Sequence, residues 1–457
     1  MKRLFGTDGI RGAAGVFPLD PPTVTRVGAA LARTLAAESP GSGRAPRILI
    51  GRDTRESGDW IERSIASGAG RAGAQCVGAG VIPTPGVAYL ARTAGFAAGV
   101  MISASHNPYR DNGIKVFSST GYKLPDHEEA AIEAMVLDGG GSLPEAEYSP
   151  APAPVSPVDL VDRYVAFLRE SVPVGTRMGG LRMVIDCANG ASSEIAPRIF
   201  RELGAEVEAV YCTPDGRNIN SGCGSLHPDG LAARVKGSGA DLGVAFDGDA
   251  DRCLFVSADG RLADGDLLIY QAASWLRKQG RLPGDLVVAT VMSNLWLERS
   301  LAEIGIQLVR TRVGDKYVLE EMVRAGAVLG GEQSGHIIFT DRATTGDGIL
   351  TALRLVEILR ATDETVAGWL SRVTAFPQIL LNVKVSSRPD MEAHPEIGAE
   401  AARVRAELGD AGRLVLRYSG TEPLARVMIE GTDAAQVETL ARRLARMIEA
   451  EIGEGKA

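Results

Sequence analysis

The stretch Val100-Met101-Ile102-Ser103-Ala104-Ser105-His106-Asn107-Pro108 changes abruptly from apolar to small polar residues and ends in a proline. Such a change is typical of a buried strand whose carboxyl end opens into a turn. Ser105 is expected in that turn, with His106 beside it and Lys115 ten residues later. A hydroxyl group in that place can carry a phosphoryl group. The alternative is a turn whose polar side chains cap the backbone.

Outward from this turn, apolar strands alternate with helices. Residues 22–37 and 60–72 have helical spacing, and residues 47–51, 75–82 and 97–102 are short apolar runs of the strand type. Short apolar runs separated by helices predict βαβ units and a mostly parallel sheet. Ligands of such sheets bind beyond the carboxyl ends of the strands, where Ser105 is expected.

Two later segments repeat this organisation. The first has strands over 183–186 and 242–246 with a helix over 193–203, and the second has strands over 286–290, 308–311 and 327–329. The recurrence predicts three related α/β modules, although no residue-level repeat is visible.

The carboxyl-terminal part differs, because strands over 378–385, 413–418 and 427–430 precede a helix over 434–452. This order predicts a small α+β domain. A stretch rich in Gly, Pro, Ala and Ser at 139–158 predicts a linker. The expected domain limits are therefore 1–158, which includes the Ser105 turn, 159–258, 259–372 and 373–457.

The composition is ordinary for a globular protein, with 45% hydrophobic and 23% charged residues among 457. A net charge of −8 gives no basic face for nucleic acid, so an anionic substrate needs local clusters of Lys and Arg. The five cysteines include no C-x-x-C pair, which predicts the reduced thiols of a cytoplasmic protein. With neither a signal peptide nor an uncharged apolar run of about 18 residues, no membrane association is expected. A homodimer stays open, because no exposed apolar helix face stands out.

A second informative stretch, Asp247-Gly248-Asp249-Ala250-Asp251-Arg252, directly follows the apolar run 242–246. Carboxylates at alternate positions can converge on one ion, and three of them leave a position for a phosphate oxygen, which suits Mg²⁺. An EF-hand is excluded, because its sixth position needs Gly and has Arg252, and its twelfth needs Glu and has Ala258. The alternative is a solvated acidic turn.

Ser105 does not fit a hydrolase. A nucleophile elbow needs Gly two residues before the serine, where Ser103 stands, and no Ser-His-Asp triad is visible. His106 is better placed to steady a phosphate than to act as a base for its neighbour. Lys115 suits general acid–base catalysis beside a phosphate if its pKa is lowered, and is otherwise a surface lysine.

Two further loops offer groups for a sugar phosphate. In Gly331-Glu332-Gln333-Ser334-Gly335-His336, Glu332 and Ser334 would face one way in an extended loop and suit vicinal sugar hydroxyls. The loop Arg417-Tyr418-Ser419-Gly420-Thr421-Glu422-Pro423, with Arg426, combines guanidinium groups, hydroxyls and a glycine N–H that suit a phosphate. The alternatives are a polar β-turn and a hairpin with surface arginines.

The motifs, taken in their order along the chain, resemble those of the α-D-phosphohexomutase superfamily. The resemblance covers essentially the whole chain, through residues 5–12, 102–117, 218–228, 247–252, 313–318, 331–336 and 417–431. It implies an α/β fold of three similar mixed-sheet α/β domains plus a C-terminal α+β domain around a central cleft. It also implies that the protein moves a phosphoryl group between two positions of a hexose.

The resemblance further implies the roles of single residues. Ser105 would be the phosphoserine, and its phosphate would hold one Mg²⁺ together with Asp247, Asp249 and Asp251. The other residues form three groups: Arg11, His106, Lys115 and Arg252 at the reacting phosphate; Glu332, Ser334 and His336 at the sugar; and Arg417, Ser419, Gly420, Thr421 and Arg426 at the distal phosphate. Tyr418 departs from the family pattern, which usually has Pro there.

Gln333 and the stretch Gly314-Asp315-Lys316-Tyr317-Val318 resemble the glucosamine branch of the superfamily. This implies interconversion of glucosamine 6-phosphate and glucosamine 1-phosphate through a 1,6-bisphosphate, with a hexose 1,6-bisphosphate as activator, for amino-sugar nucleotide and cell-wall synthesis. The alternatives are a phosphoglucomutase or phosphomannomutase of the same fold and a metal-dependent sugar-phosphate phosphatase. A non-catalytic sensor is disfavoured, because Ser105, Lys115 and the three aspartates occur together.

Overall fold

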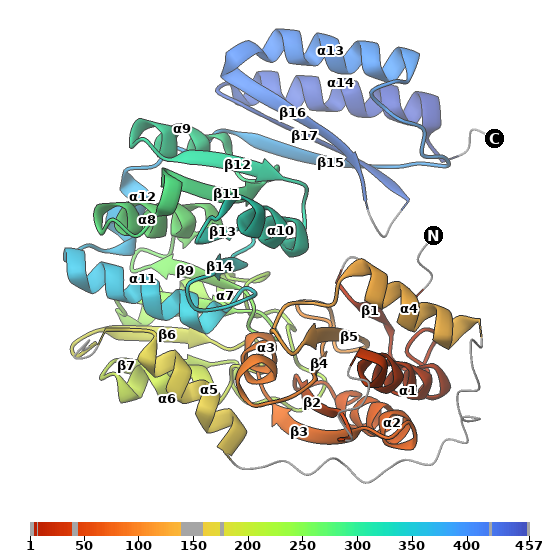
Figure 1. Ribbon diagram of the computed structural model, residues 1–457. Helices are drawn as coiled ribbons and strands as arrows, with labels where there is room; N and C mark the ends of the chain where they lie inside the picture. The colour runs from red at the N-terminus through yellow and green to blue at the C-terminus, as the bar shows by residue number, and fades with distance from the viewer. Residues whose placement is uncertain are drawn as a thin grey trace. The chain divides into compact units, whose positions relative to one another are not determined.

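The computed structural model describes residues 4–6, 8–38, 44–138, 159–173, 178–419 and 423–454. The expected linker at 139–158 lies outside these residues. The chain forms two compact units (Figure 1). The first comprises the residues up to Thr290 together with Thr311–Leu370, and the second comprises Val291–Arg310 together with the residues from Ser371 onward.

The first unit begins with a five-stranded mixed sheet in the order β1-β5-β4-β2-β3. Its strands are β1 (Ile10–Ala13), β2 (Arg47–Arg52), β3 (Gln75–Val81), β4 (Ala98–Ile102) and β5 (Asp111–Ser118). Strand β2 is parallel to β3 and β4, whereas β5 is antiparallel to both β4 and β1. All five residues of β4 are buried, as its unbroken apolar run predicts for a central strand.

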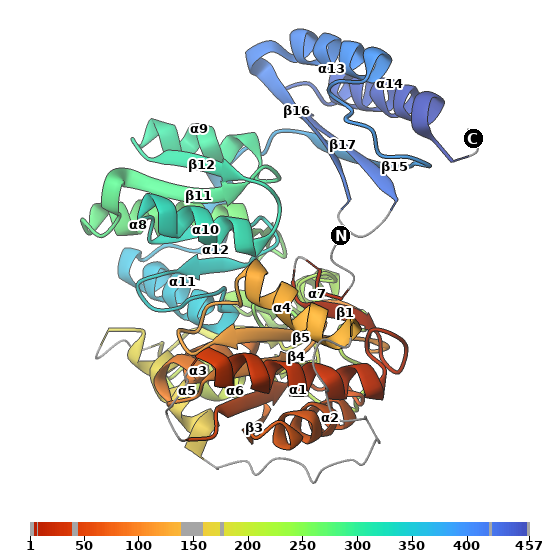
Figure 2. The same ribbon diagram turned by 45° about the vertical axis from the view of Figure 1, so that its right-hand side comes forward.

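Four helices belong to this sheet, namely α1 (Pro21–Glu38), α2 (Gly58–Arg71), α3 (Thr84–Thr93) and α4 (Asp126–Leu137). Helices α1 and α2 lie side by side (Figure 2). Their close approach depends on Gly28 and Gly68, since a Cβ atom at Gly68 would lie 1.8 Å from the carbonyl oxygen of Thr25. Apolar residues of α1, α2 and the strands form one core.

A second five-stranded sheet, in the order β10-β9-β8-β6-β7, repeats this design. Its elements are β6 (Arg182–Asp186), β7 (Glu206–Val210), β8 (Leu242–Phe246), β9 (Cys253–Ser257) and β10 (Leu262–Ala263), with helices α5 (Asp159–Glu170), α6 (Ile195–Glu202) and α7 (Asp229–Ser238). Strand β6 is parallel to β7 and β8, and β9 is antiparallel to β8. The order β9-β8-β6-β7 therefore matches β5-β4-β2-β3.

A third module follows, with β11 (Leu286–Thr290), β13 (Leu329–Gly331) and β14 (Ile337–Phe339). Strand β11 is parallel to β13, and β13 is antiparallel to β14, as in the two preceding sheets. The helices are α8 (Gly265–Lys278), α10 (Asp315–Ala325), α11 (Gly348–Thr362) and α12 (Val366–Ser371), with a 3-10 turn η1 (Pro283–Asp285). The prediction of three similar mixed-sheet modules is confirmed.

The second unit contains an antiparallel sheet in the order β15-β17-β16. Its elements are β15 (Gln378–Lys384), β16 (Gly412–Tyr418) and β17 (Leu424–Gly431), the helices α13 (Pro395–Leu408) and α14 (Ala434–Ile452), and the 3-10 turn η2 (Gly409–Ala411). The segment Val291–Arg310 adds α9 (Leu295–Glu303) and most of β12 (Gln307–Thr311). Helices α13 and α14 lie side by side on one face of the sheet (Figure 1), and this α+β arrangement is the predicted one.

Candidate active site

The turn after β4 brings Ser105 to a cluster of carboxylates. Ser105 is 1% exposed and has a φ of +52°, a left-handed conformation that is uncommon outside glycine. Its hydroxyl donates a hydrogen bond to Asp247 Oδ2 at 2.6 Å, and its Oγ lies 3.2 Å from His106 Nδ1. The serine thus lies beyond the carboxyl end of a buried strand, beside a carboxylate from the second sheet.

The carboxylates follow β8 in the same way. Asp247, Asp249 and Asp251 are buried, and one oxygen of each lies within 4.8 Å of the others. Burial, together with the charges of Asp251 and Asp249, raises the pKa of Asp247 well above its usual value. The Oδ1 atoms of Asp249 and Asp251 are buried and accept no hydrogen bond from the described residues. This oxygen-only donor set, in which two carboxylate oxygens still lack a hydrogen-bond donor, fits a hard divalent cation such as Mg²⁺.

The pairing of β1, β5 and β4 brings Arg11 and Lys115 to the same sheet. Arg11 is opposite Gly113 on β5, and Lys115 is opposite Met101 on β4. Because side chains two residues apart on a strand share a face, these strands can direct Lys115 and the residues after β4 to one side. Residues far apart in the sequence therefore meet through antiparallel register rather than through a local motif.

Lys115 is an ion-pair partner of the carboxylates. Its Nζ lies 3.0 Å from Asp249 Oδ2, and 3.3 Å from both Asp251 Oδ2 and Asp8 Oδ2. Burial lowers the pKa of Lys115, but the charges of Asp249, Asp8 and Asp251 outweigh burial and raise it well above its usual value. The lowered pKa that the sequence analysis required of a general base is therefore absent. Deprotonation of Lys115 requires these carboxylates to be neutralised first.

His106 and the two nearest arginines have the properties of an anion site. Burial first, and then the charges of Arg252 and Arg11, lower the pKa of His106 to about 4, so the imidazole is neutral near pH 7. The backbone N–H of Arg252 donates to Asp247 Oδ1 at 3.1 Å. The Nε atoms of Arg11 and Arg252 are buried and donate no hydrogen bond within the described part of the chain. A phosphate beside Ser105 would supply the missing acceptors.

The loop between β13 and β14 differs from its predicted shape. It is a tight turn, closed by hydrogen bonds from Gly335 N to Glu332 O and from Glu332 N to His336 O, both of 2.9 Å. The expectation of an extended loop is wrong, because the glycine at 335 has a φ of +93° and reverses the chain. Glu332 Oε1 accepts the Gly314 N–H at 3.1 Å, whereas Ser334 Oγ is buried and makes no hydrogen bond to any described residue.

His336 lies between this loop and the carboxylates. Its Nε2 accepts the Gly346 N–H at 3.0 Å, and its Nδ1 lies 3.6 Å from Asp251 Oδ1. The imidazole therefore joins the third module to the carboxylate cluster.

Gln333 does not extend toward the groups that were expected to bind the sugar. Its Nε2 donates to Asp264 Oδ2 at 3.1 Å, and its carbonyl oxygen accepts the Gly265 N–H at 2.9 Å. Asp264 caps the first turn of α8. Gln333 thus secures the loop to α8.

In the second unit, Arg417 on β16 is directly opposite Arg426 on β17. Burial and the nearby charge of Arg426 lower the pKa of Arg417. Arg426 Nη2 lies within 3.4 Å of Ser419 Oγ. Because like charges opposite each other destabilise a sheet, this pair is suited to an anion. The predicted ligands Gly420 and Thr421 lie outside the described residues.

Family models of phosphoglucomutase/phosphomannomutase match the chain in four consecutive parts. They are alpha/beta/alpha domain I at residues 2–140, domain II at 162–260, domain III at 264–376 and the C-terminal domain at 380–447. A phosphoglucosamine mutase from Solibacter usitatus is 50% identical over 454 residues, which cover 99% of this chain and 100% of the relative. The chain belongs to the phosphoglucosamine mutase family. It is therefore a phosphohexomutase, an isomerase.

Solved structures show the same fold. A phosphoglucomutase/phosphomannomutase family protein from Burkholderia thailandensis has a TM-score of 0.79 at 23% identity, with 98% of each chain covered. The N-acetylphosphoglucosamine mutase of Aspergillus fumigatus, solved with GlcNAc-6P and magnesium, has a TM-score of 0.68 at 19% identity and covers 98% of this chain and 96% of that chain. Among the described residues, no helix has the length and apolar character required to cross a bilayer.

Sequence reasoning missed several residues that this phosphohexomutase brings to the site. Thr84, at the start of α3, donates from Oγ1 to Asp249 Oδ2 at 2.6 Å. Asp8 pairs with Arg11 and with Lys123, whose Nζ also lies 2.6 Å from Asp315 Oδ2. Asp8 and Asp315 lie within the motifs at 5–12 and 313–318, so their position in the sequence could have indicated a role. Lys123 lies in none of the motifs.

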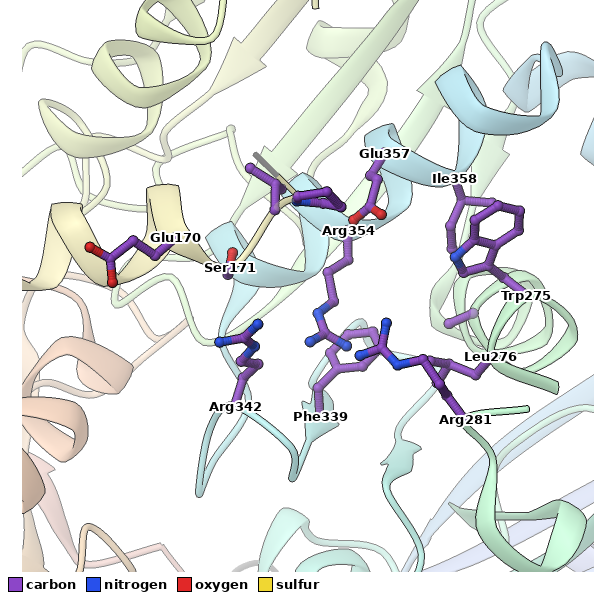
Figure 3. Close-up of a pocket in the computed structure, with 13 residues that line it drawn as sticks. Glu170, Ser171, Trp275, Leu276, Arg281, Phe339, Arg342, Arg354, Glu357 and Ile358 are labelled. Atoms are coloured by element: carbon purple, nitrogen blue, oxygen red, sulfur yellow. The ribbon is translucent and has the colours of Figure 1, made fainter. Parts of the chain in front are cut away.

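A cavity of about 280 Å³ lies elsewhere in the first unit of this phosphohexomutase (Figure 3). No predicted site residue lines it. Two of its arginines, Arg281 and Arg354, donate to the same carboxylate oxygen, Asp341 Oδ2, at 3.1 and 2.8 Å. Arg354 also stacks on Phe339, with 4.7 Å between the guanidinium carbon and the ring centroid. These arginines already have an anionic partner, so the cavity is not the candidate active site.

Proposed function

We propose that the chain interconverts glucosamine 6-phosphate and glucosamine 1-phosphate, with phosphorylated Ser105 as the phosphoryl carrier. The proposal is carried by the 2.6 Å hydrogen bond from Ser105 Oγ to a cluster of three aspartates. A hydroxyl beside oxygen ligands for a cation suits phosphoryl transfer, which depends on positioning and charge stabilisation. The name of the Solibacter usitatus relative supports glucosamine as the sugar.

Asp247, Asp249 and Asp251, together with a phosphate oxygen on Ser105, would hold one Mg²⁺. When bound, the ion would stabilise the negative charge of the transferred group. Arg11 and Arg252 would hold the same group through their unsatisfied Nε–H donors, and neutral His106 would accept or donate one further hydrogen bond.

Transfer in this proposal exchanges one P–O bond for another. The bond from phosphorus to Ser105 Oγ breaks as phosphorus bonds to the free hydroxyl of glucosamine 6-phosphate. Lys115 gives a proton to Ser105 Oγ and receives the proton that the hydroxyl loses, which suits a lysine that begins protonated. The 1,6-bisphosphate then turns, and the reverse exchange returns its other phosphoryl group to Ser105. A hexose 1,6-bisphosphate would act as activator by phosphorylating free Ser105.

Two further groups would bind the non-reacting parts of the substrate. Glu332, Ser334 and His336 would contact the sugar, with the buried Ser334 hydroxyl as the group that still needs a partner. The distal phosphate would be held by Arg417, Ser419, Gly420, Thr421 and Arg426. We also propose domain limits after residues 158, 258 and 372 and a homodimer. A cytoplasmic location is proposed as well, and the five free cysteines support it.

A parallel assay of glucosamine 6-phosphate, glucose 1-phosphate and mannose 1-phosphate, with Mg²⁺ and phosphorylated protein, tests the proposal. We expect kcat/KM to be at least about tenfold higher for the amino sugar, as a site that pairs a polar substituent discriminates strongly. Equal or faster turnover of glucose or mannose phosphate would assign the chain to the phosphoglucomutase/phosphomannomutase activity. Release of inorganic phosphate without isomerisation would indicate a phosphatase.

A further inference from the structure

The carbonyl oxygens of the turn from Ser105 to Pro108 converge on two side chains that the proposed chemistry does not use. Arg55 Nη2 donates to Ser105 O at 3.0 Å and to Asn107 O at 2.8 Å, and its Nη1 donates to Pro108 O. Asn220 Nδ2 donates to the same two carbonyls, Ser105 O at 2.8 Å and Asn107 O at 3.1 Å. The two side chains therefore bind the turn from the first and the second module.

Arg55 is itself fixed by a buried network. Its side chain is fully buried, and its Nε donates to Asp53 Oδ2 at 2.9 Å. The same carboxylate oxygen accepts the Ser103 hydroxyl at 2.7 Å, and Ser103 Oγ accepts the Ser105 N–H at 2.9 Å. Both the N–H and the carbonyl of Ser105 are thus held by one network, which over-determines its left-handed φ of +52°.

Asn220 belongs to the motif at 218–228, for which the sequence suggested no chemistry. Its backbone N–H donates to Ala188 O at 2.9 Å, and its φ of +57° is one that asparagine tolerates. Gly248, between the first two aspartates, packs against the same contact. A Cβ atom there would lie 2.6 Å from Ser105 O and 2.8 Å from Asn220 Nδ2. Asn220 therefore helps to set the distance between the serine turn and the carboxylates.

We propose that Arg55 and Asn220 are positioning residues for phosphoryl transfer, and that they orient Ser105 by binding the carbonyls of its turn. The inference rests on the proposed role of Ser105 as carrier. In-line transfer requires the serine oxygen, the phosphorus and the sugar oxygen to be aligned, and a displacement of about 1 Å can cost about 10²-fold in rate. Both residues are buried and bind the carbonyls of the turn, so their loss should lower kcat and leave KM largely unchanged.

Asn220→Gly is the cleanest test, because glycine adopts the same φ without strain and only the two donors are lost. We expect kcat for glucosamine 6-phosphate to fall about 10- to 100-fold, with KM within about threefold of wild type. Asn218→Ser is the matched control, since Asn218 lies in the same loop and its side chain contacts Thr213 and Asp215 instead of the serine turn. Its kcat should equal that of the wild type, even though the loss of its own two side-chain hydrogen bonds lowers the melting temperature.

Arg55→Lys keeps a charge beside Asp53 but reaches fewer carbonyls, and Asn220→Asp presents an acceptor to two acceptors. Both should lose at least as much kcat as Asn220→Gly.

The inference is wrong if Asn220→Gly keeps kcat within twofold of an active wild type, or if its kcat falls only in proportion to the fraction of unfolded protein. Amide hydrogen exchange at Ser105 gives a readout independent of activity, and it should accelerate in Asn220→Gly but not in Asn218→Ser. An inactive wild type would refute the proposed function instead, while this exchange would still test the positioning of the turn.

Discussion

The Ser105 turn and the Arg417–Arg426 pair are both expected to meet a phosphate, but they are built in opposite ways. At Ser105 the N–H, the carbonyl and the hydroxyl each have a protein partner, and the residue is 1% exposed. Arg417 is half-buried; within the described residues its Nε donates no hydrogen bond, and its Nη1 donates to Tyr418 O at 3.5 Å. The protein thus fixes all three polar groups of Ser105, whereas the buried Nε–H of Arg417 has no acceptor among the described residues. In the proposed reaction the 1,6-bisphosphate turns between two transfers. The serine must then stay in place while the distal phosphate is bound and released.

The largest effect should come from Ser105→Ala. If the fixed turn exists to present this hydroxyl, its loss should lower mutase activity by at least about 10⁴-fold, as loss of a nucleophile does in other enzymes. Phosphate incorporation into the protein, followed by mass spectrometry, should disappear as well. Ser118→Ala, at the half-buried end of β5, is the control and should retain full activity. Turnover above trace levels in Ser105→Ala would refute the carrier role.

Asp249→Asn comes next, because it removes one carboxylate from the cluster that Ser105 faces. We expect an activity loss of about 10²–10³-fold, comparable to removing a charge-stabilising group. Chelation of divalent ions should have a similar effect on the wild type. Added Mg²⁺ should raise the melting temperature of the wild type but not of this variant.

The matched control for Asp249→Asn is Asp259→Asn, an exposed carboxylate paired with Arg261. It should retain both the activity and the response to Mg²⁺. An equal thermal response in Asp249→Asn and in the wild type would place the ion elsewhere.

Arg417→Ala tests the other side of the comparison. A hydrogen bond to a charged group is worth about 1.5–3 kcal/mol, so KM should rise about 10- to 100-fold with a smaller change in kcat. This is the reverse of the pattern expected for the residues that hold Ser105. Arg446→Ala, on the exposed face of α14, is the control. A fall in kcat at unchanged KM would mean that Arg417 acts on the transfer step.

The sequence was most informative where one local pattern decides the structure. The predicted strand 242–246 and helix 434–452 have the bounds observed for β8 and α14, because one is apolar throughout and the other is apolar on one face. Strand β5 was missed, although it carries Lys115. Its polar residues obscure the pattern, and their partners are distant in the chain, as when Asn112 Nδ2 donates to Ser57 Oγ at 2.8 Å.

The candidate active site shows the same contrast between local patterns, which could be predicted, and long-range contacts, which could not. Ser105 and the aspartates could be predicted because each follows a recognisable strand. Arg55, Lys123 and Asn220 could not be assigned a role, because the contacts that bring them to the site join residues 50 to 192 positions apart. The sequence left two shapes open for residues 332–335, an extended loop and a polar β-turn, and Gly335 at φ +93° decides for the turn.

The last prediction concerns stability rather than activity, namely the cost of burying the Asp347 carboxylate. Asp347 caps α11, accepts the Tyr164 hydroxyl at 2.8 Å and is buried, and burial raises its pKa to about 6. Since its pKa is higher in the folded protein than in the unfolded chain, this group favours folding below about pH 4, and that contribution is lost as the pH rises through 6. Asp347→Asn removes the charge, keeps the cap on the Leu350 N–H through Oδ1, and can bond Tyr164 Oη by donating from Nδ2. Its stability relative to the wild type should therefore increase between pH 4.5 and 7.5, by at most about 3 kcal/mol.

Melting curves across this range provide the measurement, with Asp433→Asn, the exposed cap of α14, as the control for loss of a capping charge. A pH-independent difference would show that the carboxylate of Asp347 is not destabilised by burial.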